Sequence, residues 1–281
     1  MTPAIWTGIY ATDTLPAALE RLVGLGWGCF ELSTEHLEAI DGDGDPPARI
    51  AEAKAALERL GVSMPQAHGY LGANVAHPDQ ARREGDRATL GRHLAHCAAL
   101  GVRTVVMHPG VTPWTTRAQL AGILKLNREA FTRLGELAGE LGLTIGIENT
   151  MDPTRSGGRV LGALPQELLE LVAGVGSPAL GITFDTSHAH CQRLDLPAAI
   201  REFGRLLCAT HISDNDGSGD QHRMPGVGTI DWPAVVGALR EIGYEGPFNL
   251  EIPGERHPVP EILARKLRHA REVAGWLVGE G

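Results

Sequence analysis

Residues 181–188 read GITFDTSH, and this stretch contains the pattern from which the fold is predicted. The apolar run 181–184 has the length and composition of a buried strand. Asp185 and His188, two residue types that bind metals, follow the run at once. Similar runs with similar endings recur along the chain, so this stretch is one unit of a repeat.

Short apolar runs alternate with longer amphipathic stretches throughout the chain. The predicted strands are residues 4–9, 29–32, 62–67, 104–107, 144–147, 181–184, 207–211 and 247–252. The predicted helices include residues 47–60, 87–100, 119–141, 165–172, 232–242 and 260–277. Eight strand–helix units in 281 residues average about 35 residues each, the size of a βα repeat. Alternation implies parallel strands and eight units favour closure, so we predict an α/β fold, a single (β/α)8 TIM barrel spanning residues 1–281.

Several predicted helices end at a glycine that is followed by an apolar residue. These glycines are Gly61, Gly101, Gly142 and Gly243. Glycine adopts the left-handed backbone conformation that ends many helices, and the next apolar residue starts the return to a strand. The run 41–47 (DGDGDPP) resembles a calcium loop but lacks the downstream Glu, so a solvated loop is expected there.

Composition and charge limit the kinds of partner. The formal net charge is −9 and no stretch is densely basic, which argues against broad binding to nucleic acid or an anionic membrane. No apolar run reaches the roughly 18 residues of a membrane span, and the N-terminus does not resemble a signal peptide. We expect Cys29, Cys97, Cys191 and Cys208 to be free thiols in a reducing compartment, which makes the cytoplasm the predicted location.

Six consecutive predicted strands end in a residue type that can bind a metal ion. These residues are His68, His108, Glu148, Asp185, His211 and Glu251, spaced 26 to 40 residues apart. A barrel gathers its C-terminal strand ends around one mouth, so these side chains are expected to converge. Their charges would be costly together without a cation. Carboxylate oxygens with imidazole nitrogens suit Mn²⁺, Mg²⁺, Co²⁺ or Zn²⁺.

Further polar residues lie in or near this pattern. Asp220 and His222 follow strand seven in a glycine-containing segment that could fold back over the mouth. Asp185 could instead be a helix cap, and His190 is either a neighbour of the site or merely structural. The remaining histidines are expected at the surface or in packing: His36, His77, His93, His96, His257 and His269.

At these positions the chain resembles the xylose-isomerase-like barrel superfamily, which includes sugar isomerases, epimerases and endonuclease IV. The segments that carry the resemblance are 147–149, 184–188, 211–217 and 220–232. In the isomerase and epimerase branch, the resemblance implies one metal held by Glu148, Asp185, His211 and Glu251. It also implies that the two glutamates exchange protons with the substrate and that His188 binds a substrate oxygen.

The endonuclease IV branch implies a different use of the same mouth, with three zinc ions acting on abasic DNA. Read position by position, the sequence offers all nine ligands of that branch: His68, His108, Glu148, Asp185, His188, His211, Asp220, His222 and Glu251. The segment 31–38 is nevertheless acidic and has no Arg, where the nuclease branch has a loop that enters DNA. Glu31 at the end of strand two is typical of the sugar-acting branch. The segment 214–217 is also acidic, and it would repel phosphates.

The ketose-epimerase pattern has one departure. Those enzymes have an Arg six residues after the strand-seven His, and here that position is Gly217. Arg223 is a candidate substitute that could bind substrate. No Gly-rich phosphate loop with a nearby Lys is present, which predicts no nucleotide cofactor and weakens the case for a sugar phosphate relative to a free sugar or keto-acid.

The sequence thus predicts a divalent-metal-dependent isomerase or epimerase that acts on a small sugar, sugar phosphate or keto-polyol. Glu148 and Glu251 are its candidate proton-transfer residues. A small-molecule carbohydrate is the expected partner, with nucleic acid and membrane not expected, and barrels of this type often form homodimers. Three alternatives stay open: a multi-zinc phosphodiesterase, another reaction on the same metal platform such as dehydration or deglycosylation, and a non-catalytic binding module.

Overall fold

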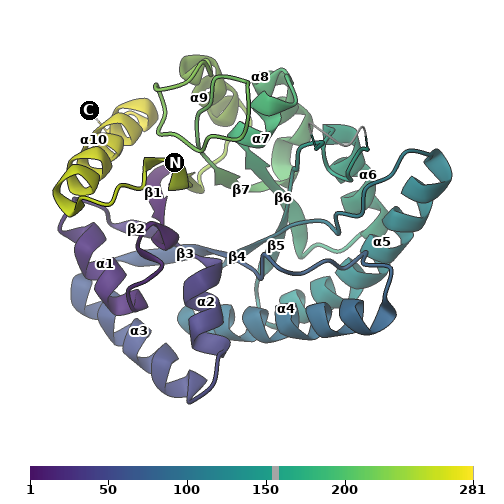
Figure 1. Ribbon diagram of the computed structural model, residues 1–281, viewed down its shortest axis with the longest axis horizontal. Helices are drawn as coiled ribbons and strands as arrows, with labels where there is room; N and C mark the ends of the chain where they lie inside the picture. Colours follow the sequence, from purple (N-terminus) through teal and green to yellow (C-terminus); the bar gives the residue numbers. More distant parts are fainter. Residues whose placement is uncertain (154–157, 281) are drawn as a thin grey trace.

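The computed structural model describes residues 1–153 and 158–280, and within them eight parallel strands form a barrel with helices around it (Figure 1). The strands are β1 (Thr2–Trp6), β2 (Cys29–Leu32), β3 (Ser63–His68), β4 (Thr104–Met107), β5 (Thr144–Glu148), β6 (Leu180–Asp185), β7 (Leu207–His211) and β8 (Pro247–Leu250). They pair in the order β7-β6-β5-β4-β3-β2-β1-β8. The predicted barrel is confirmed.

The helices follow the strands and cover the outside of the barrel (Figure 1). They are α1 (Leu15–Val23), α2 (Thr34–Asp41), α3 (Pro46–Leu60), α4 (Gln80–Leu100), α5 (Arg117–Glu140), α6 (Pro165–Val175), α7 (Thr186–Cys191), α8 (Leu196–Phe203), α9 (Trp232–Glu241) and α10 (Pro260–Val278). The last helix, α10, packs against β1, so the two ends of the described chain lie on the same side of the barrel.

The barrel closes between β7 and β8 through Ile212, the residue after β7. The Ile212 amide donates to the Asn249 carbonyl at 2.7 Å, and the Glu251 amide donates to the Ile212 carbonyl at 3.1 Å. These bonds bring the end of β7 next to the end of β8. They therefore fix the relative positions of the side chains that follow both strands.

Local sequence explains how a typical helix starts, packs and ends. In α1 the Thr14 side chain accepts a hydrogen bond from the Ala17 amide, and a proline lies in the first turn. Leu15, Leu19 and Leu22 are buried on one face against the barrel. Truncating such a fully buried leucine to alanine costs about 2–5 kcal/mol of stability.

The glycine predictions are confirmed at the helix ends. Gly61 after α3 and Gly101 after α4 have φ values of 66° and 81°, in the left-handed region. The 41–47 run forms the end of α2, a loop and the start of α3. The Arg49 guanidinium donates to carbonyl groups of this loop, including those of Gly42 and Asp43. Residues 42–45 are exposed, as expected for a solvated connection.

Two of the predicted boundaries that differ from the structure have a clear local cause. The first strand was expected at 4–9, but β1 ends at Trp6, and Thr7–Tyr10 form a 3-10 turn. The helix expected to start at residue 87 starts at Gln80, because the Asp79 side chain accepts bonds from the amides of Ala81 and Arg82. Its first turns are polar, so the apolar pattern did not reveal them.

Two further features concern the whole chain. The four cysteines are free thiols, with Cys29 and Cys97 buried and Cys191 and Cys208 partly buried. Within residues 1–153 and 158–280, every helix is too short or too polar to cross a membrane.

Candidate metal centre

Four side chains from four strands meet at the C-terminal end of the barrel. Glu148, Asp185 and His211 are the last residues of β5, β6 and β7, and Glu251 directly follows β8. One potential ligand atom from each lies within 4.8 Å of those of the others. The structure therefore brings together the four residues that the sequence predicted as metal ligands.

Both glutamates of this group approach the same nitrogen of His211. The Nδ1 atom of His211 lies 3.0 Å from Oε1 of Glu148 and 3.5 Å from Oε2 of Glu251. The Glu148 side chain is 1% exposed and that of Glu251 is 13% exposed. Glu148 thus forms the floor of the site, and Glu251 borders the solvent at the mouth.

The two carboxylate oxygens of Asp185, at the end of β6, have different surroundings. Its Oδ1 atom accepts a hydrogen bond from the His188 amide at 2.8 Å and so caps α7. Its Oδ2 atom is buried and has no hydrogen-bond partner among the described residues. Asp185 could therefore be both a helix cap and a metal ligand, because each role uses a different carboxylate oxygen.

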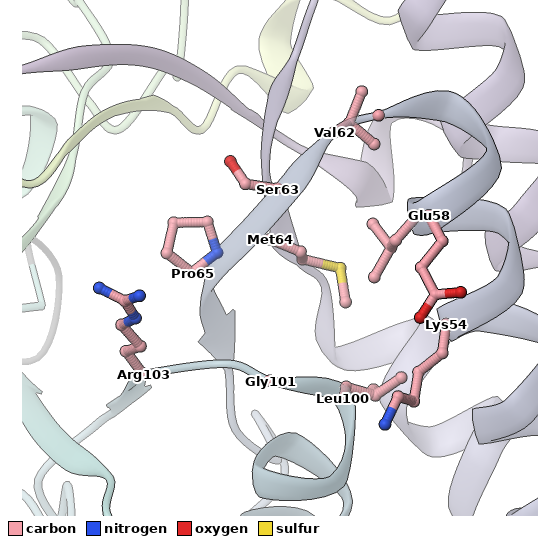
Figure 2. Close-up of a pocket in the computed structure, with 11 residues that line it drawn as sticks. Lys54, Glu58, Val62, Ser63, Met64, Pro65, Leu100, Gly101 and Arg103 are labelled. Atoms are coloured by element: carbon pink, nitrogen blue, oxygen red, sulfur yellow. The ribbon is translucent and has the colours of Figure 1, made fainter.

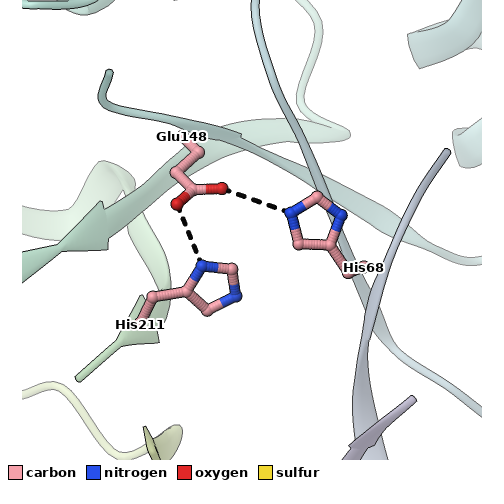
Figure 3. Close-up of side chains that lie close together, drawn as sticks. All are labelled: His68, Glu148 and His211. Carbon is pink, nitrogen blue, oxygen red and sulfur yellow. Dashed lines mark hydrogen bonds and ion pairs between the residues drawn. The ribbon is translucent and has the colours of Figure 1, made fainter. Parts of the chain in front are cut away.

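His68 and His108 lie on the β3–β4 side of the same mouth. The Nε2 atoms of His68 and His108 lie 3.5 Å and 3.0 Å from Oε2 of Glu148. Figure 3 shows His68 and His211 facing the two oxygens of Glu148 from different strands. Although these atoms are close, neither ring is oriented to donate a hydrogen bond to Oε2 of Glu148. Such contacts fit side chains that surround a bound ion or ligand.

His188, Asp220 and His222 form a second group at the rim of the mouth. Oδ2 of Asp220 lies 2.8 Å from Nε2 of His222 and 3.4 Å from Nε2 of His188. Oδ1 of Asp220 accepts a hydrogen bond from the Ser187 hydroxyl at 2.6 Å. Asp185, His188 and His222 also place potential ligand atoms within 4.8 Å of one another. The predicted outer residues are thus adjacent to the predicted inner ones.

Burial and charge shift the pKa values of the inner group in opposite directions. Burial alone would raise the pKa of Glu148, but His211 and His108 hold it well below its usual value. Burial alone would lower the pKa of His211, but the surrounding carboxylates, chiefly Glu31 and Glu148, raise it well above its usual value. Burial raises the pKa of Asp185 to about 6.

The rim group behaves in a similar way. Burial opposes the charged forms, but Asp185 and Asp220 raise the pKa of His188 well above its usual value. Burial would lower the pKa of His222, but the hydrogen bond to Asp220 together with the charges of Glu251 and Asp185 raises it to about 9. His188 and His222 in turn lower the pKa of Asp220 against the effect of burial. The mouth therefore contains carboxylates whose charged form is stabilised by nearby positive charge.

The residues fit a divalent cation. Two buried carboxylate oxygens, Oε2 of Glu148 and Oδ2 of Asp185, have no hydrogen-bond donor among the described residues. An unpaired buried anionic oxygen is costly, and a cation between these oxygens would remove the cost. The donor set of carboxylate oxygen and imidazole nitrogen suits Mn²⁺, Mg²⁺, Co²⁺ or Zn²⁺.

Several residues around the site had no predicted role. The side-chain amide of Asn149 donates to the Asp185 carbonyl and accepts from the Asp185 amide, and the Asn149 carbonyl accepts a bond from Nδ1 of His188 at 2.9 Å. Glu31 was noted only as a marker of the sugar-acting branch, and it contacts His211 and Gln66 inside the barrel. In the sequence, Glu31 and Gln66 stand out only as polar residues within strands. The sequence does not show which other strands their side chains face.

The remaining predictions for the mouth have mixed outcomes. Among the described residues, the side chain of Arg223 makes no hydrogen bond or ion pair, and its backbone pairs with Asp214. His190 bonds to the Thr229 hydroxyl at 2.8 Å, which gives it a structural contact. The other six histidines are absent from the three groups of potential metal ligands, and His36 and His93 are buried in packing.

The cavity in Figure 2 is unrelated to this site. It has a volume of about 510 Å³ and is lined by residues that include Lys54, Ser63 and Arg103. Ser63 is the first residue of β3 and His68 is the last, so the cavity lies at the opposite end of the barrel from the mouth. None of the predicted site residues lines it.

The chain belongs to the family described as xylose isomerase-like TIM barrel, whose model matches residues 19–273. An uncharacterized protein of Methanocaldococcus jannaschii is 34% identical over 268 residues, which cover 94% of this chain and 88% of that protein. A ketose 3-epimerase of Arthrobacter globiformis is 25% identical over 251 residues, covering 88% and 80% of the two chains. Probable endonuclease 4 of Trichlorobacter lovleyi is 28% identical over 233 residues, covering 77% and 80%.

Solved structures agree on the fold. A D-tagatose 3-epimerase-like protein superposes with a TM-score of 0.82 at 24% identity, covering 100% of this chain and 99% of that one. The IOLI protein, solved with a bound zinc atom, gives a TM-score of 0.79 at 19% identity, covering 100% and 99%. Relatives of this chain thus include sugar epimerases and endonuclease 4, and at these identities the structural matches establish the barrel only.

Proposed function

We propose that this protein is a divalent-metal-dependent isomerase or epimerase of a small sugar or related keto-polyol. The observation that carries the proposal is the convergence of Glu148 and Glu251 on Nδ1 of His211, at 3.0 and 3.5 Å. Two carboxylates beside one potential metal ligand are the groups that a proton transfer needs. The ketose 3-epimerase relative supports the reaction class.

Glu148, Asp185, His211 and Glu251 would hold the metal, for which Mn²⁺, Mg²⁺, Co²⁺ and Zn²⁺ are all suitable ions. When bound, the ion polarises a substrate carbonyl and a neighbouring hydroxyl and so makes the adjacent C–H more acidic. The IOLI protein, which has the same fold, binds zinc. A zinc-binding protein of the same fold is consistent with a metal ion in this chain.

Glu148 and Glu251 would exchange the proton with the substrate carbon. Glu148 extends from β5 and Glu251 follows β8, three strands further around the closed barrel, so they reach the mouth from different directions. One carboxylate can remove a proton and the other can return it on a different face of the carbon. The buried histidines around Glu148 keep its pKa low and therefore keep it ionised.

The rim residues would bind the substrate oxygens. His188 has its Nδ1–H bonded to the Asn149 carbonyl, so its Nε2 faces Asp220 and the mouth. His108 is 27% exposed, the most accessible histidine of the site. Gly217 occurs where ketose epimerases have Arg, and Arg223 is the candidate substitute. We therefore expect the substrate, a small sugar or keto-polyol, to be held differently from the substrates of the ketose epimerases.

Deuterium exchange tests this proposal. Metal-free protein is loaded with Mn²⁺ and incubated in D₂O with a panel of ketoses and keto-polyols, and deuterium uptake is followed by NMR. We expect metal-dependent uptake at one carbon of at least one substrate, and its loss in Glu148→Gln and in Glu251→Gln. Absence of uptake across the panel with fully metal-loaded protein would contradict the proposal. Retained ligand binding without any exchange would indicate a binding module.

A multi-zinc phosphodiesterase is the second candidate, because His68, His108 and the rim group extend the donor set beyond four residues. Two features oppose it. Only Ser33 separates β2 from α2, so no protruding loop follows β2 to enter DNA. Asp216 on the rim has its pKa lowered to about 2 by hydrogen bonds, chiefly from Ser218, so it remains negative.

Elemental analysis separates the two candidates. One tightly held metal ion per chain and no cleavage of an abasic duplex would support the isomerase. Three zinc ions per chain together with cleavage would support the phosphodiesterase. A metal content between one and three ions per chain is resolved by replacing both His68 and His108 by Asn. Only a multi-metal site would lose metal when both rings are removed.

A further inference from the structure

Glu31 is a fully buried acidic residue inside the barrel, one layer below the metal centre. It belongs to β2, and its Cα atom pairs in register with that of Gln66 on β3. Both side chains are 0% exposed. The Gln66 amide donates to Oε2 of Glu31 and also to the Thr210 carbonyl at 3.2 Å. The carboxylate of Glu31 is therefore tied to β2, β3 and β7 at once.

The same oxygen of Glu31 contacts the histidine of the metal centre. The Nε2–H of His211 donates to Oε2 of Glu31 at 2.9 Å. Nδ1 of His211 lies at the other side of the ring, within 3.5 Å of the carboxylates of Glu148 and Glu251. His211 thus has one nitrogen toward the barrel interior and the other toward the predicted metal ligands.

Stability alone is a poor reason for this arrangement. A buried ion pair contributes little net stability, because the loss of hydration offsets the attraction between the charges. Oε1 of Glu31 has no hydrogen-bond partner among the described residues, which adds to the cost. A carboxylate that accepts the N–H of a metal-binding histidine, in contrast, fixes the ring and its tautomer and makes the other nitrogen a better ligand.

We propose that Glu31 is the positioning residue of the metal centre: it keeps the proton of His211 on Nε2 and so directs Nδ1 to the metal. The proposal rests on the metal site proposed above and adds a residue that does not touch the metal. Gln66 supports Glu31 in turn by fixing the orientation of its carboxylate. The dependence of metal binding on Glu31 is the consequence to be tested.

Metal affinity of the whole protein is the first measurement. Dissociation constants for Zn²⁺ and Mn²⁺ are determined by chelator competition for the wild type, Glu31→Gln, Glu31→Leu and Thr183→Val. We expect Glu31→Gln to bind about 10- to 100-fold more weakly, because the amide can still accept the N–H but has lost the charge. Glu31→Leu should bind more weakly still. Thr183 is also fully buried within the barrel, and its near-isosteric change to Val should leave affinity within about twofold.

Nitrogen NMR is the second measurement and does not depend on activity. In zinc-loaded protein labelled with ¹⁵N-histidine, we expect His211 to have its proton on Nε2 and the metal on Nδ1, with assignment from the His211→Asn variant. The Glu31→Leu variant should lose the strongly hydrogen-bonded Nε2–H signal. A merely structural role for Glu31 would change stability without changing the affinity for metal, because a metal on Nδ1 by itself leaves the proton on Nε2.

The outcomes are distinct. Folded Glu31→Gln and Glu31→Leu proteins that bind metal as tightly as the wild type would overturn the inference, as would a wild-type His211 with its proton on Nδ1. If both variants fail to fold, the wild-type NMR spectrum still tests the inference, which requires a strongly hydrogen-bonded Nε2–H on a His211 that holds the metal through Nδ1. If the wild type binds no divalent ion, the proposed metal site is refuted, and the inference about Glu31 is refuted with it. Metal binding that is insensitive to Glu31 refutes only the inference about Glu31.

Discussion

The carboxylate of Asp214 accepts a hydrogen bond from the indole nitrogen of Trp232 at 2.9 Å, across 18 residues of sequence. The same buried carboxylate accepts bonds from the amides of Gly226 at 2.9 Å and Ile230 at 3.2 Å. These donors enclose the segment between β7 and α9, which includes Asp220 and His222. Asp214 therefore holds the rim of the mouth in place, although its sequence position resembles that of the predicted metal ligands.

Replacing Asp214 by Ala should destabilise the protein. The change removes the acceptor of several buried donors, and we expect a loss of about 3 kcal/mol in the free energy of unfolding, measured by urea denaturation. The control is Asp231→Ala, which removes only the cap of α9 and should cost about 1 kcal/mol. Equal effects of the two changes would show that Asp214 does not organise the segment.

Replacing Glu251 by Gln should abolish proton exchange while the fold persists. Glu251 borders the solvent, so the change leaves no new buried charge, and loss of one acid–base group lowers the rate about 10²- to 10⁴-fold. The deuterium-exchange rate of the metal-loaded protein measures this. Asp216→Asn is the control, since Asp216 is an acidic residue of the rim loop outside the three groups of potential ligands. Undiminished exchange in Glu251→Gln would remove it from the chemistry.

Metal removal should lower the melting temperature. Without a cation, Oε2 of Glu148 and Oδ2 of Asp185 lack a hydrogen-bond donor among the described residues. An ion that binds only the folded state adds about 2.7 kcal/mol when its concentration is 100 times its dissociation constant. Calorimetry of the chelator-treated protein, with and without added Mn²⁺ or Zn²⁺, measures the shift. A melting temperature that no divalent ion changes would argue against a site formed by these residues.

Acid should destabilise the protein partly through His93, which is distant from the metal centre. Burial lowers the pKa of His93 to about 4, against the attraction of Asp41 and together with the repulsion of His96 and Arg92. Because the folded pKa is below the unfolded value, neutral His93 contributes stability above about pH 6.5. That contribution is lost as the pH falls through about 4.

The His93→Leu variant tests this pH dependence. Between pH 7 and pH 4, its free energy of unfolding should fall by about 2–3 kcal/mol less than that of the wild type. Urea denaturation of both proteins across this range gives the difference, in which the titration of the metal centre cancels. His269→Leu serves as the control, because His269 is 62% exposed and should change nothing. Parallel curves for the wild type and His93→Leu would disprove the assignment.

Much of the fold and part of the site could be predicted because both depend on periodicity along the chain. Apolar runs that alternate with amphipathic stretches require parallel strands, and parallel strands put their C-terminal residues at one mouth. Glu148, Asp185 and His211 could therefore be grouped from sequence. The start of α4 at Gln80 could not be predicted, because it depends on a polar cap and exposed turns.

The sequence by itself determined which residues gather at the mouth, but only the tertiary structure decided which of them face one another. Glu31 and His211 are 180 residues apart and meet inside the barrel, while Asp214, only three residues after His211, is bonded to Trp232 instead. The physical reason is strand register. Pairing shifts between Cys29 and Glu31 in β2 and between Ile182 and Thr183 in β6. A shift of one residue moves a side chain to the other face of a sheet, and no local pattern shows where such shifts occur.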